Sequence, residues 1–463
     1  MTLGEMVINR LNGKQKNWNL KPLLGLGLLL VANSGYSQDM PTGASVQSGN
    51  ITITGTGTNH MVIDQATQKS IINWDSFSIH SGGRVDFNQP SAKSFSLNRV
   101  QGSMPSSIAG QLNSNGKVML INPNGVAITP NGVVDTGSFT ASTLNIKDND
   151  FMKDNYSFEG NGKSKGVKNG GKIRIGGGGH AALLGGYVSN TGTVTARLGK
   201  IAMGSGEKIT LDFVGDGLMS VTVPSHQLGI IKDIKGRTLQ SLVNNAGILK
   251  ANGGMIKLSA ASAKSLSRGA VNLGSSSMVI AKSLKNKPGR VVVGSPSNGQ
   301  IRVAGNINVS GKSSMIPSGK VLVQGRNITH LGQISANGHS GGKVSILSKG
   351  NLKLDGKIFA KGKLDKGGSV KFLSEKNVIS SKNSIVIASG QNKGGTVRSL
   401  AKLNNDTSGT YNVDSEAGYG GKIDVTGKSV NLEAANLSAK GNSVGGKIRI
   451  GGEYLGGKEL TGT

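Results

Sequence analysis

The sequence predicts an all-β protein, a right-handed parallel β-helix with an N-terminal cap. Short runs of Val, Ile, Leu and Thr recur between turns rich in Gly, Asn and Ser, as at residues 50–57 and 343–348. Gly-Gly pairs recur with spacings of 26, 27, 26 and 25 residues, and their first members are Gly341, Gly367, Gly394, Gly420 and Gly445. A fixed period in this range indicates stacked supersecondary units, here coils of three short strands each.

Internal similarity is also visible between "NTGTVTARLGKIAM" at residues 190–203 and "NAGILKANGGMIKL" at residues 245–258. We expect inward Val, Ile and Leu to stack as a ladder through the coils, and each Gly-Gly corner to stand where a Cβ would collide. A β-propeller is the alternative fold. Blades of about 40–45 residues with Trp-Asp signatures are missing, however, since Trp18 and Trp74 are the two tryptophans.

The first 37 residues predict a secretory signal with a long basic region. Four Lys and Arg residues precede the apolar run "PLLGLGLLLVA" at residues 22–32, which is shorter than the about 20 residues needed to span a bilayer. Small residues follow, and we expect cleavage between Ser37 and Gln38. No later segment reaches transmembrane length, so the sequence predicts a protein that leaves the cytoplasm and is not integral to a membrane.

Composition narrows the classes of site and partner. The 463 residues include 73 Gly, 10 Pro and no Cys, which excludes disulfides and Cys-based zinc sites. The net charge of +29 comes from basic residues spread along the whole chain. Nucleic-acid binding is not predicted, because neither a groove-binding helix nor a set of aromatic stacking platforms is visible. Diffuse positive charge suits an anionic cell surface or polysaccharide, and it equally suits solvated faces without a partner.

One stretch, "VMLINPNGVAIT" at residues 118–129, is more closely specified than its surroundings. Asn suits the first position of a type I turn, Pro presets φ at the second, and Gly suits the fourth. The apolar flanks are predicted as short buried strands. A solenoid needs a cap over its first coil, and the dense block at residues 60–145 is predicted to form the cap and the first coils. The four turn residues are Asn122, Pro123, Asn124 and Gly125.

The run "INWDSFSI … VDFNQP … FSLNRVQG … GQLNSNGKVMLINPNGVAIT … GSFTASTLNI" resembles the N-terminal secretion domain of filamentous haemagglutinin-type exoproteins, the cargo of two-partner secretion systems. "SLNRV" at residues 96–100 stands where one subclass of that family carries a further Asn-Pro-Asn motif. The chain also lacks the cysteine pair of some members, so it is more similar to the high-molecular-weight adhesin branch. We expect a secretion domain at residues 38–215 and Gly-rich β-helix repeats at residues 216–463.

The resemblance implies a route across two membranes of a Gram-negative bacterium, ending in secretion or at the outer-membrane surface. Such exoproteins cross the periplasm unfolded, are recognised by the periplasmic domains of an outer-membrane transporter, and fold outside as their coils stack. By the resemblance, residues 122–125 are the secretion motif, and Asn98 and Arg99 belong to a second secretion-domain block. Whether the turn contacts the transporter or supports folding is open. The folding role is favoured, because a wrong residue between two buried strands shifts their register.

Catalysis, metal binding and cofactor binding are not predicted. Asp and Glu total 24, and no acidic pair recurs at coil spacing as a polysaccharide lyase or hydrolase site requires. The acids at 148–150 and 212–216 are interpreted as solvated loop residues. The corners read Gly-Gly-Lys, which differs from the acidic Ca²⁺-binding repeat. The histidines show no metal-ligand spacing, and they are His60, His80, His180, His226, His330 and His339.

Two functions follow from the resemblance. The first is an adhesin-type exoprotein that contacts a host cell surface or glycan through its repeats. The alternative is the carrier portion of a haemolysin or of a contact-dependent growth-inhibition toxin, which would carry a non-repetitive C-terminal domain. Gly-rich repeats run nearly to Thr463, which favours the adhesin. The chain stops in "GGKELTGT" without an obvious cap, so we also expect a truncated product.

Overall fold

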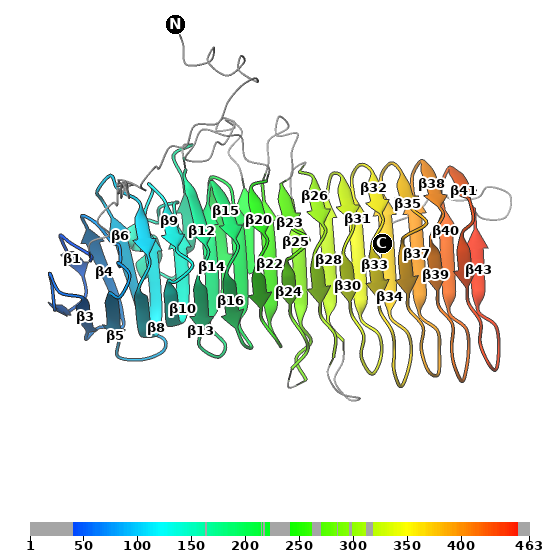
Figure 1. The fold of residues 1–463 in the computed structure, drawn as a ribbon, viewed down its shortest axis with the longest axis horizontal. Coiled ribbons are helices and arrows are strands. Elements are labelled where there is room, and N and C mark those ends of the chain that lie inside the picture. The colour runs from blue at the N-terminus through cyan, green and yellow to red at the C-terminus, as the bar shows by residue number, and fades with distance from the viewer. Residues whose placement is uncertain are drawn as a thin grey trace, which may run out of the picture. The chain divides into compact units, whose positions relative to one another are not determined.

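The computed structural model describes residues 40–162, 164–213, 215, 218–222, 241–261, 270–284, 286–295, 299–311 and 318–451. Within these residues the chain winds into a stack of coils whose strands pair in parallel from one coil to the next (Figure 1). The all-β, parallel β-helix class is therefore confirmed. The predicted signal at residues 1–37, the cleavage pair Ser37 and Gln38, and residues 452–463 lie outside the described residues.

Each complete coil contributes one strand to each of three rows that run along the stack. The first row is a 12-stranded sheet of β7 (Ser106–Ile108), β9 (Val126–Ile128), β12 (Gly166–Asn169), β15 (Tyr187–Asn190), β20 (Val243–Asn245), β23 (Val271–Leu273), β26 (Ile301–Val303), β29 (Ile328–His330), β32 (Leu352–Leu354), β35 (Val378–Ser380), β38 (Asn404–Thr407) and β41 (Ser429–Leu432).

The second and third rows belong to one 28-stranded sheet. The second row starts with β3 (His60–Gln65) and β5 (Arg84–Asn88) and continues with β13 (Lys172–Ile175), β16 (Thr193–Ala196), β21 (Ile248–Lys250), β24 (Met278–Ile280), β27 (Asn306–Asn308), β30 (Gln333–Ser335), β33 (Lys357–Phe359), β36 (Ile385–Ile387), β39 (Thr410–Asn412) and β42 (Asn436–Ser438).

The third row holds most of the longer strands. It comprises β4 (Lys69–Trp74), β6 (Phe95–Val100), β14 (His180–Gly185), β17 (Lys200–Ser205), β22 (Met255–Ala260), β25 (Arg290–Gly294), β28 (Lys320–Gly325), β31 (Lys343–Ser348), β34 (Ser369–Ser374), β37 (Thr396–Ala401), β40 (Lys422–Thr426) and β43 (Lys447–Ile450). Two strands, β8 (Gln111–Ile121) and β10 (Val133–Ser142), are long enough to serve both the second and the third row.

The predicted period is the period of the coils. In the third row Lys343 pairs with Ser369, Ser369 with Thr396, and Thr396 with Lys422. These steps have the same lengths as the Gly-Gly spacings. The two similar segments also stack directly on each other, because Asn190 pairs with Asn245 and Lys200 with Met255.

The Gly-Gly corners are tight in both directions along the stack. A Cβ on Gly367 would collide with the carbonyl oxygen of Ala388 in the following coil. A Cβ on Gly368 would collide with the carbonyl oxygen of Gly342 in the preceding coil. The expected collision at the corners is therefore confirmed, and the two glycines of a pair face opposite neighbours.

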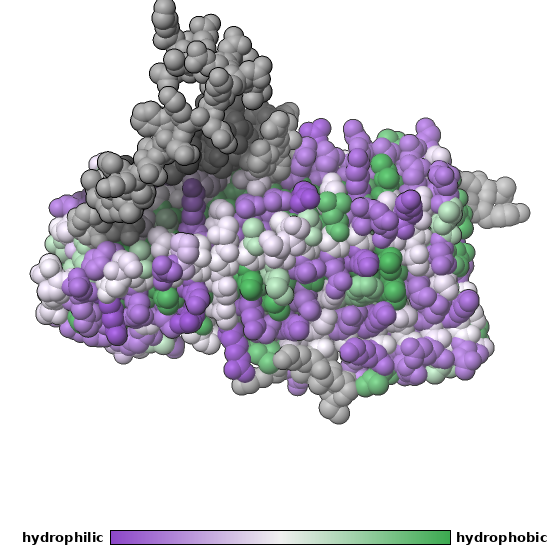
Figure 2. Space-filling view, in the orientation of Figure 1, coloured by the Kyte–Doolittle hydropathy of each residue, from purple (hydrophilic) through white to green (hydrophobic). Residues whose placement is uncertain are grey.

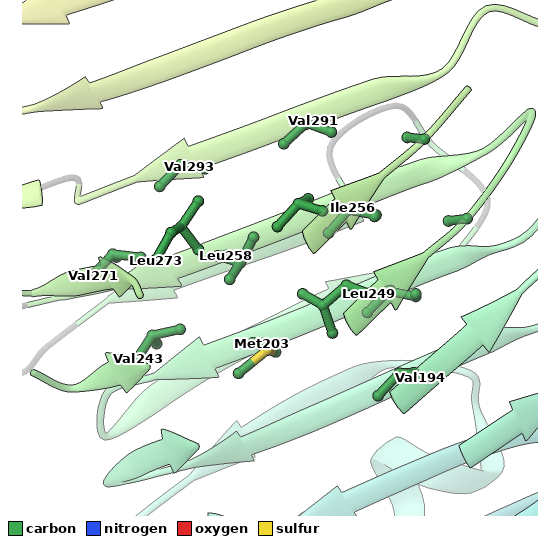
Figure 3. Close-up of a cluster of buried hydrophobic side chains, with 14 of the residues drawn as sticks. Val194, Met203, Val243, Leu249, Ile256, Leu258, Val271, Leu273, Val291 and Val293 are labelled. Carbon is green, nitrogen blue, oxygen red and sulfur yellow. The ribbon is translucent and has the colours of Figure 1, made fainter. Parts of the chain in front are cut away.

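The inward side chains form the predicted aliphatic ladder. Strands of the third row alternate buried and exposed residues, so that Val344, Val370 and Val397 follow one another in successive coils with no exposed surface. Figure 3 shows the same stacking in earlier coils, where Leu249 of β21, Ile256 and Leu258 of β22 and Leu273 of β23 belong to the buried cluster. One continuous cluster therefore runs through the stack, as expected for narrow coils.

The cap differs in position from the prediction. Antiparallel strands close the start of the stack, β1 (Ser45–Ser48) on β4 and β2 (Ile51–Thr54) on β3. The block at residues 60–145 supplies the first coils, and these earlier residues supply the cap. Residues 51–54 alternate with the same period of two as a coil strand, so periodicity does not distinguish antiparallel from parallel pairing.

An additional unit outside the coils was not predicted. It consists of α1 (Asp148–Met152) and an antiparallel sheet of β11 (Tyr156–Glu159), β18 (Lys208–Asp212) and β19 (Leu218–Thr222). Its apolar side chains, among them Phe151 and Phe158, share a second buried cluster with Phe95 and Met119 from the outer face of the third row.

The additional unit corrects two interpretations. The run "KITLDF" at residues 208–213 is not a coil strand, because it lies mostly in β18 and pairs antiparallel with β11 and β19. The acids at 148–150 begin α1, where Asp148 is ion-paired, so solvation is not their whole role. In the described part of the chain, no helix is both long and apolar enough to cross a membrane.

Candidate functional site

The predicted turn at residues 122–125 joins β8 to β9. The backbone N–H of Gly125 donates to the carbonyl oxygen of Asn122 at 3.0 Å, which closes the turn. The backbone N–H of Asn124 donates to Oδ1 of Asn122 at 2.9 Å, so the first side chain also stabilises the turn from within. Gly125 has φ +125°, a value that favours glycine. Space does not require glycine there, because the nearest atom to an added Cβ would be the carbonyl oxygen of Gly166 at 3.6 Å.

Both asparagine side chains reach the backbone of the preceding coil. Asn122 is fully buried, and its Nδ2 donates to the carbonyl oxygen of Met104 at 2.9 Å and to Oγ of Ser106 at 3.0 Å. Nδ2 of Asn124 donates to the carbonyl oxygen of Gly102 at 2.8 Å. The turn thereby holds residues 102–106, the segment that connects β6 to β7. Pro123 is the exposed member of the four.

Asn98 of the second block lies inside the first coils. It is fully buried, and its Oδ1 accepts from Nε1 of Trp74 at 3.0 Å. Its Nδ2 donates to Oγ of Ser96 at 3.1 Å and to the carbonyl oxygen of Met119 at 3.4 Å. One amide therefore connects β4, β6 and β8, the third-row strands of consecutive coils.

Arg99 points to the opposite side of β6 and binds the additional unit. Its Nε donates to Oδ1 of Asn145 at 3.0 Å, and its Nη2 donates to the carbonyl oxygen of Ile146 at 2.8 Å. Nη2 also lies 2.7 Å from Oδ1 of Asp148 at the start of α1. The planar guanidinium can make these contacts together, which a lysine cannot.

The structure brings the two predicted blocks together. Asn98 pairs with Leu120 and Arg99 with Ile121, one residue before the turn. Sequence reasoning identified Asn98 and Arg99 only through the resemblance, and it missed Gly102, Met104 and Ser106, the partners of the two asparagines of the turn. Those partners act mostly through backbone carbonyls, which carry no residue-specific signal.

Sequence reasoning also missed a buried asparagine ladder in the first row. Nδ2 of Asn169 donates to Oδ1 of Asn190 at 2.8 Å, and Nδ2 of Asn190 donates to Oδ1 of Asn245 at 2.7 Å. All three are buried. The available signal is the triplet Asn-x-Gly, which recurs at the first-row end of these coils.

The two described histidines with the largest pKa shifts, His180 and His330, are core residues. Burial lowers the pKa of His180 to about 3, with a further contribution from Lys117 and Lys200. Burial alone lowers the pKa of His330 to about 4. Both rings are therefore neutral at physiological pH. Among the described residues, no group of three His, Asp or Glu side chains is placed to hold a metal ion, and His226 lies outside them.

The capped parallel β-helix agrees with comparisons to known proteins. The family model of the TPS secretion domain matches residues 37–309. The chain belongs to the two-partner secretion exoproteins. Exoproteins of this family are secreted across the outer membrane of Gram-negative bacteria, and the domain implies interaction with an outer-membrane transporter.

Individual relatives of this exoprotein come from Haemophilus influenzae. The crystal structure of the HMW1 secretion domain superposes with a TM-score of 0.64 at 25% identity, covering 89% of this chain and 100% of that one. A heme/hemopexin-binding protein is 34% identical over 245 residues, which is 50% of this chain and 25% of the relative. A second heme/hemopexin-binding protein is 36% identical over 120 residues, covering 26% of this chain and 13% of the relative. The matched region thus spans a quarter or less of the two heme/hemopexin-binding relatives.

Proposed function

We propose that the N-terminal domain directs export through a cognate outer-membrane transporter, whose periplasmic domains recognise it, and that it nucleates folding of the β-helix. In this proposal the turn at residues 122–125 acts through folding. This proposal rests on the hydrogen bonds that the two asparagine side chains make within the protein. Asn122 donates to the backbone carbonyl of Met104, and Asn124 donates to the backbone carbonyl of Gly102. Pro123 is left as the side chain available to a partner.

The exported coils are proposed to serve as an adhesin-type surface without enzymatic activity. Hydrophilic side chains run in rows across successive C-terminal coils on the face in Figure 2, which is a repetitive surface for multivalent contact. The buried amides of the first coils are engaged with the backbone and offer neither a nucleophile nor a general base. The carrier portion of a haemolysin or of a contact-dependent growth-inhibition toxin is the alternative.

The names of the two relatives favour haem or hemopexin as a second candidate ligand. The purified chain should be titrated with haemin, following the Soret absorbance, and mixed with immobilised hemopexin. A saturable haem spectrum or retained hemopexin would support this ligand over an adhesin role. The absence of both with retained binding to host cells would support the adhesin.

Export is tested by expressing the full chain with and without the cognate transporter and comparing the yield in the medium or on the cell surface. The proposal predicts surface protein with the transporter and periplasmic degradation without it. As a control on the assay, Asn431→Ala replaces an exposed asparagine of β41 and should export like the wild type. Equal export without the transporter would overturn the proposal.

A further inference from the structure

A groove crosses the corners of four consecutive coils in the C-terminal half, a Ser-Gly corner at Gly319 followed by three Gly-Gly corners. It has a volume of about 430 Å³, and its floor is backbone at Gly342, Gly368 and Gly395. Its walls are the residues immediately before and after the glycines. Because the coils stack in register, the groove runs along the stack and repeats the same elements at each step of about 4.8 Å.

Each of these four coils places one lysine on the groove. Lys320 and Lys343 follow the glycines and pair directly across β28 and β31. Lys366 and Lys393 precede the glycines and are joined by a parallel bridge. Three of the four coils also line the groove with a hydroxyl residue on the other side of the glycines from the lysine, and these residues are Ser318, Ser369 and Thr396.

The four lysines lack close ion pairs within the described chain, unlike several basic residues further along the stack. All four are exposed, and none forms an ion pair with an acidic residue of the described chain. Asp365 interacts electrostatically with its neighbour Lys366 without forming a close ion pair, and it accepts a hydrogen bond from Oγ of Ser340 at 2.6 Å. Like charges stacked at this spacing repel one another, and an external anion would relieve that repulsion.

Basic residues on β37, β40 and β43 differ from the groove lysines, because they share a buried acidic partner. Asp424 is buried in β40 and lies 3.4 Å from Arg398, 3.2 Å from Lys422 and 3.2 Å from Arg449. The fold supplies an acid to these three bases, whereas Lys343, which stands at the position of Lys422 three coils earlier in the same row, has no ion pair in the described chain.

We infer that this groove binds a linear anionic polysaccharide, lying along the stack with its carboxylate or sulfate groups on the four lysines. The inference deepens the adhesin function proposed above and rests on it. The glycine floor lets a narrow polymer approach the backbone, and the hydroxyls of Ser318, Ser369 and Thr396 suit sugar hydroxyls. Tyr419, 58% exposed, continues the lysine wall into the next coil and offers a flat face to a sugar ring. Single-stranded nucleic acid would require several such aromatic platforms.

The test uses purified full chain, so it does not depend on export. Binding of heparin and polygalacturonate is measured by calorimetry across a salt series, with dextran as the neutral polymer and single-stranded DNA as the rival polyanion. The test variant changes Lys320, Lys343, Lys366 and Lys393 to Ala. The matched control removes the same charge from exposed lysines away from the groove, Lys353, Lys357, Lys382 and Lys402.

The groove variant should lose about 30-fold in affinity for the anionic polysaccharides, because each exposed ion pair contributes about two- to threefold. The control should lose less than about threefold, and the thermal midpoints of both variants should match the wild type. Equal losses in both variants would overturn the groove and leave diffuse charge. DNA binding as tight as polysaccharide binding, with the same loss in the groove variant, would overturn the polysaccharide as occupant. Normal export with no polysaccharide binding would reject this inference alone.

Discussion

Buried side-chain amides connect the first coils at two points, Asn98 and Asn122. A buried amide costs free energy unless each of its groups is hydrogen-bonded. Both amides find partners on neighbouring coils, at Met119 for Asn98 and at Met104 for Asn122. A shift of one residue in strand pairing would leave them unpaired in an apolar interior. At the scale of single residues, these amides therefore specify register in a way that the aliphatic ladder alone does not.

His330 is a polar residue placed in an apolar stack. It pairs between Val303 and Leu354 in the first row, and neither ring nitrogen has a hydrogen-bond partner. Its folded-state pKa of about 4 is below the ordinary 6.5, so the unfolded chain binds an additional proton between these values. Stability from the neutral ring is complete above pH 6.5 and is lost as the pH falls toward 4.

We predict that His330→Leu removes this pH dependence. At pH 7 the variant should be more stable by about 1–3 kcal/mol, since a leucine needs no hydrogen bond there. Between pH 6.5 and 4 the advantage should grow by up to about 3 kcal/mol. Urea unfolding of the wild type and the variant at a series of pH values measures this difference in stability. His60→Gln, at an exposed ring, serves as control. Parallel pH profiles for wild type and His330→Leu would show that His330 titrates normally.

Arg99 is predicted to hold the additional unit on the coils. Arg99→Lys should lose the forked contacts to Asn145, Ile146 and Asp148, at a cost of about 1–3 kcal/mol for opening the unit. Hydrogen exchange at the amides of α1 and β11 should accelerate, while exchange in β31 stays unchanged. Arg302→Lys, at an exposed arginine of β26, is the matched control. Unchanged exchange in α1 would mean that the apolar cluster alone holds the unit.

At the scale of elements, the Gly-Gly corners set how closely coils approach. Gly394→Ala should destabilise the protein by about 3 kcal/mol or more, because its Cβ would meet the carbonyl oxygen of Val413 and the backbone N of Gly421. Gly445→Ala is the matched control, since nothing lies within 4 Å of its added Cβ. Thermal midpoints compare the two. Equal effects would show that conformational freedom, and not space, selects glycine at these corners.

The elements predictable from sequence are those whose packing repeats. A corner that collides with both neighbours demands glycine in every coil, so the period was visible at Gly367 and Gly394. The cap and the additional unit occur once each, and their strands alternate like coil strands. "KITLDF" is an example. Ile209 and Leu211 are buried as in a coil strand, but their strand pairs antiparallel with β11 and β19. Pattern alone does not reveal which partner a strand takes.

The candidate site was predictable to a similar degree. The turn at residues 122–125 followed from local preferences for Asn, Pro and Gly at fixed positions. The contacts of its side chains depend on the path of residues 102–106, which is a tertiary property. Asn98 and Arg99 came from the family resemblance, and their opposite orientations follow from the alternation along β6.

At the scale of the whole molecule, each coil contacts only its two neighbours, so stability is set by a series of interfaces between coils. In such a stack the first coils matter most for starting the fold, because later coils add to an existing edge. The buried amides and the pinned turn lie in those first coils. We propose that the turn serves folding of this region, and that export depends on it for that reason.

Chemical unfolding of purified Asn122→Ala/Asn124→Ala, compared with its export yield, tests this claim most directly. Loss of both side chains removes the hydrogen bonds to the carbonyl oxygens of Met104 and Gly102 and the one that the backbone N–H of residue 124 donates to the Asn122 side chain. The free energy of unfolding of the first coils should therefore fall by about 2–5 kcal/mol. Export should fall with it. A variant that unfolds like the wild type and yet is no longer exported would contradict the account, and would assign the turn to direct recognition by the transporter.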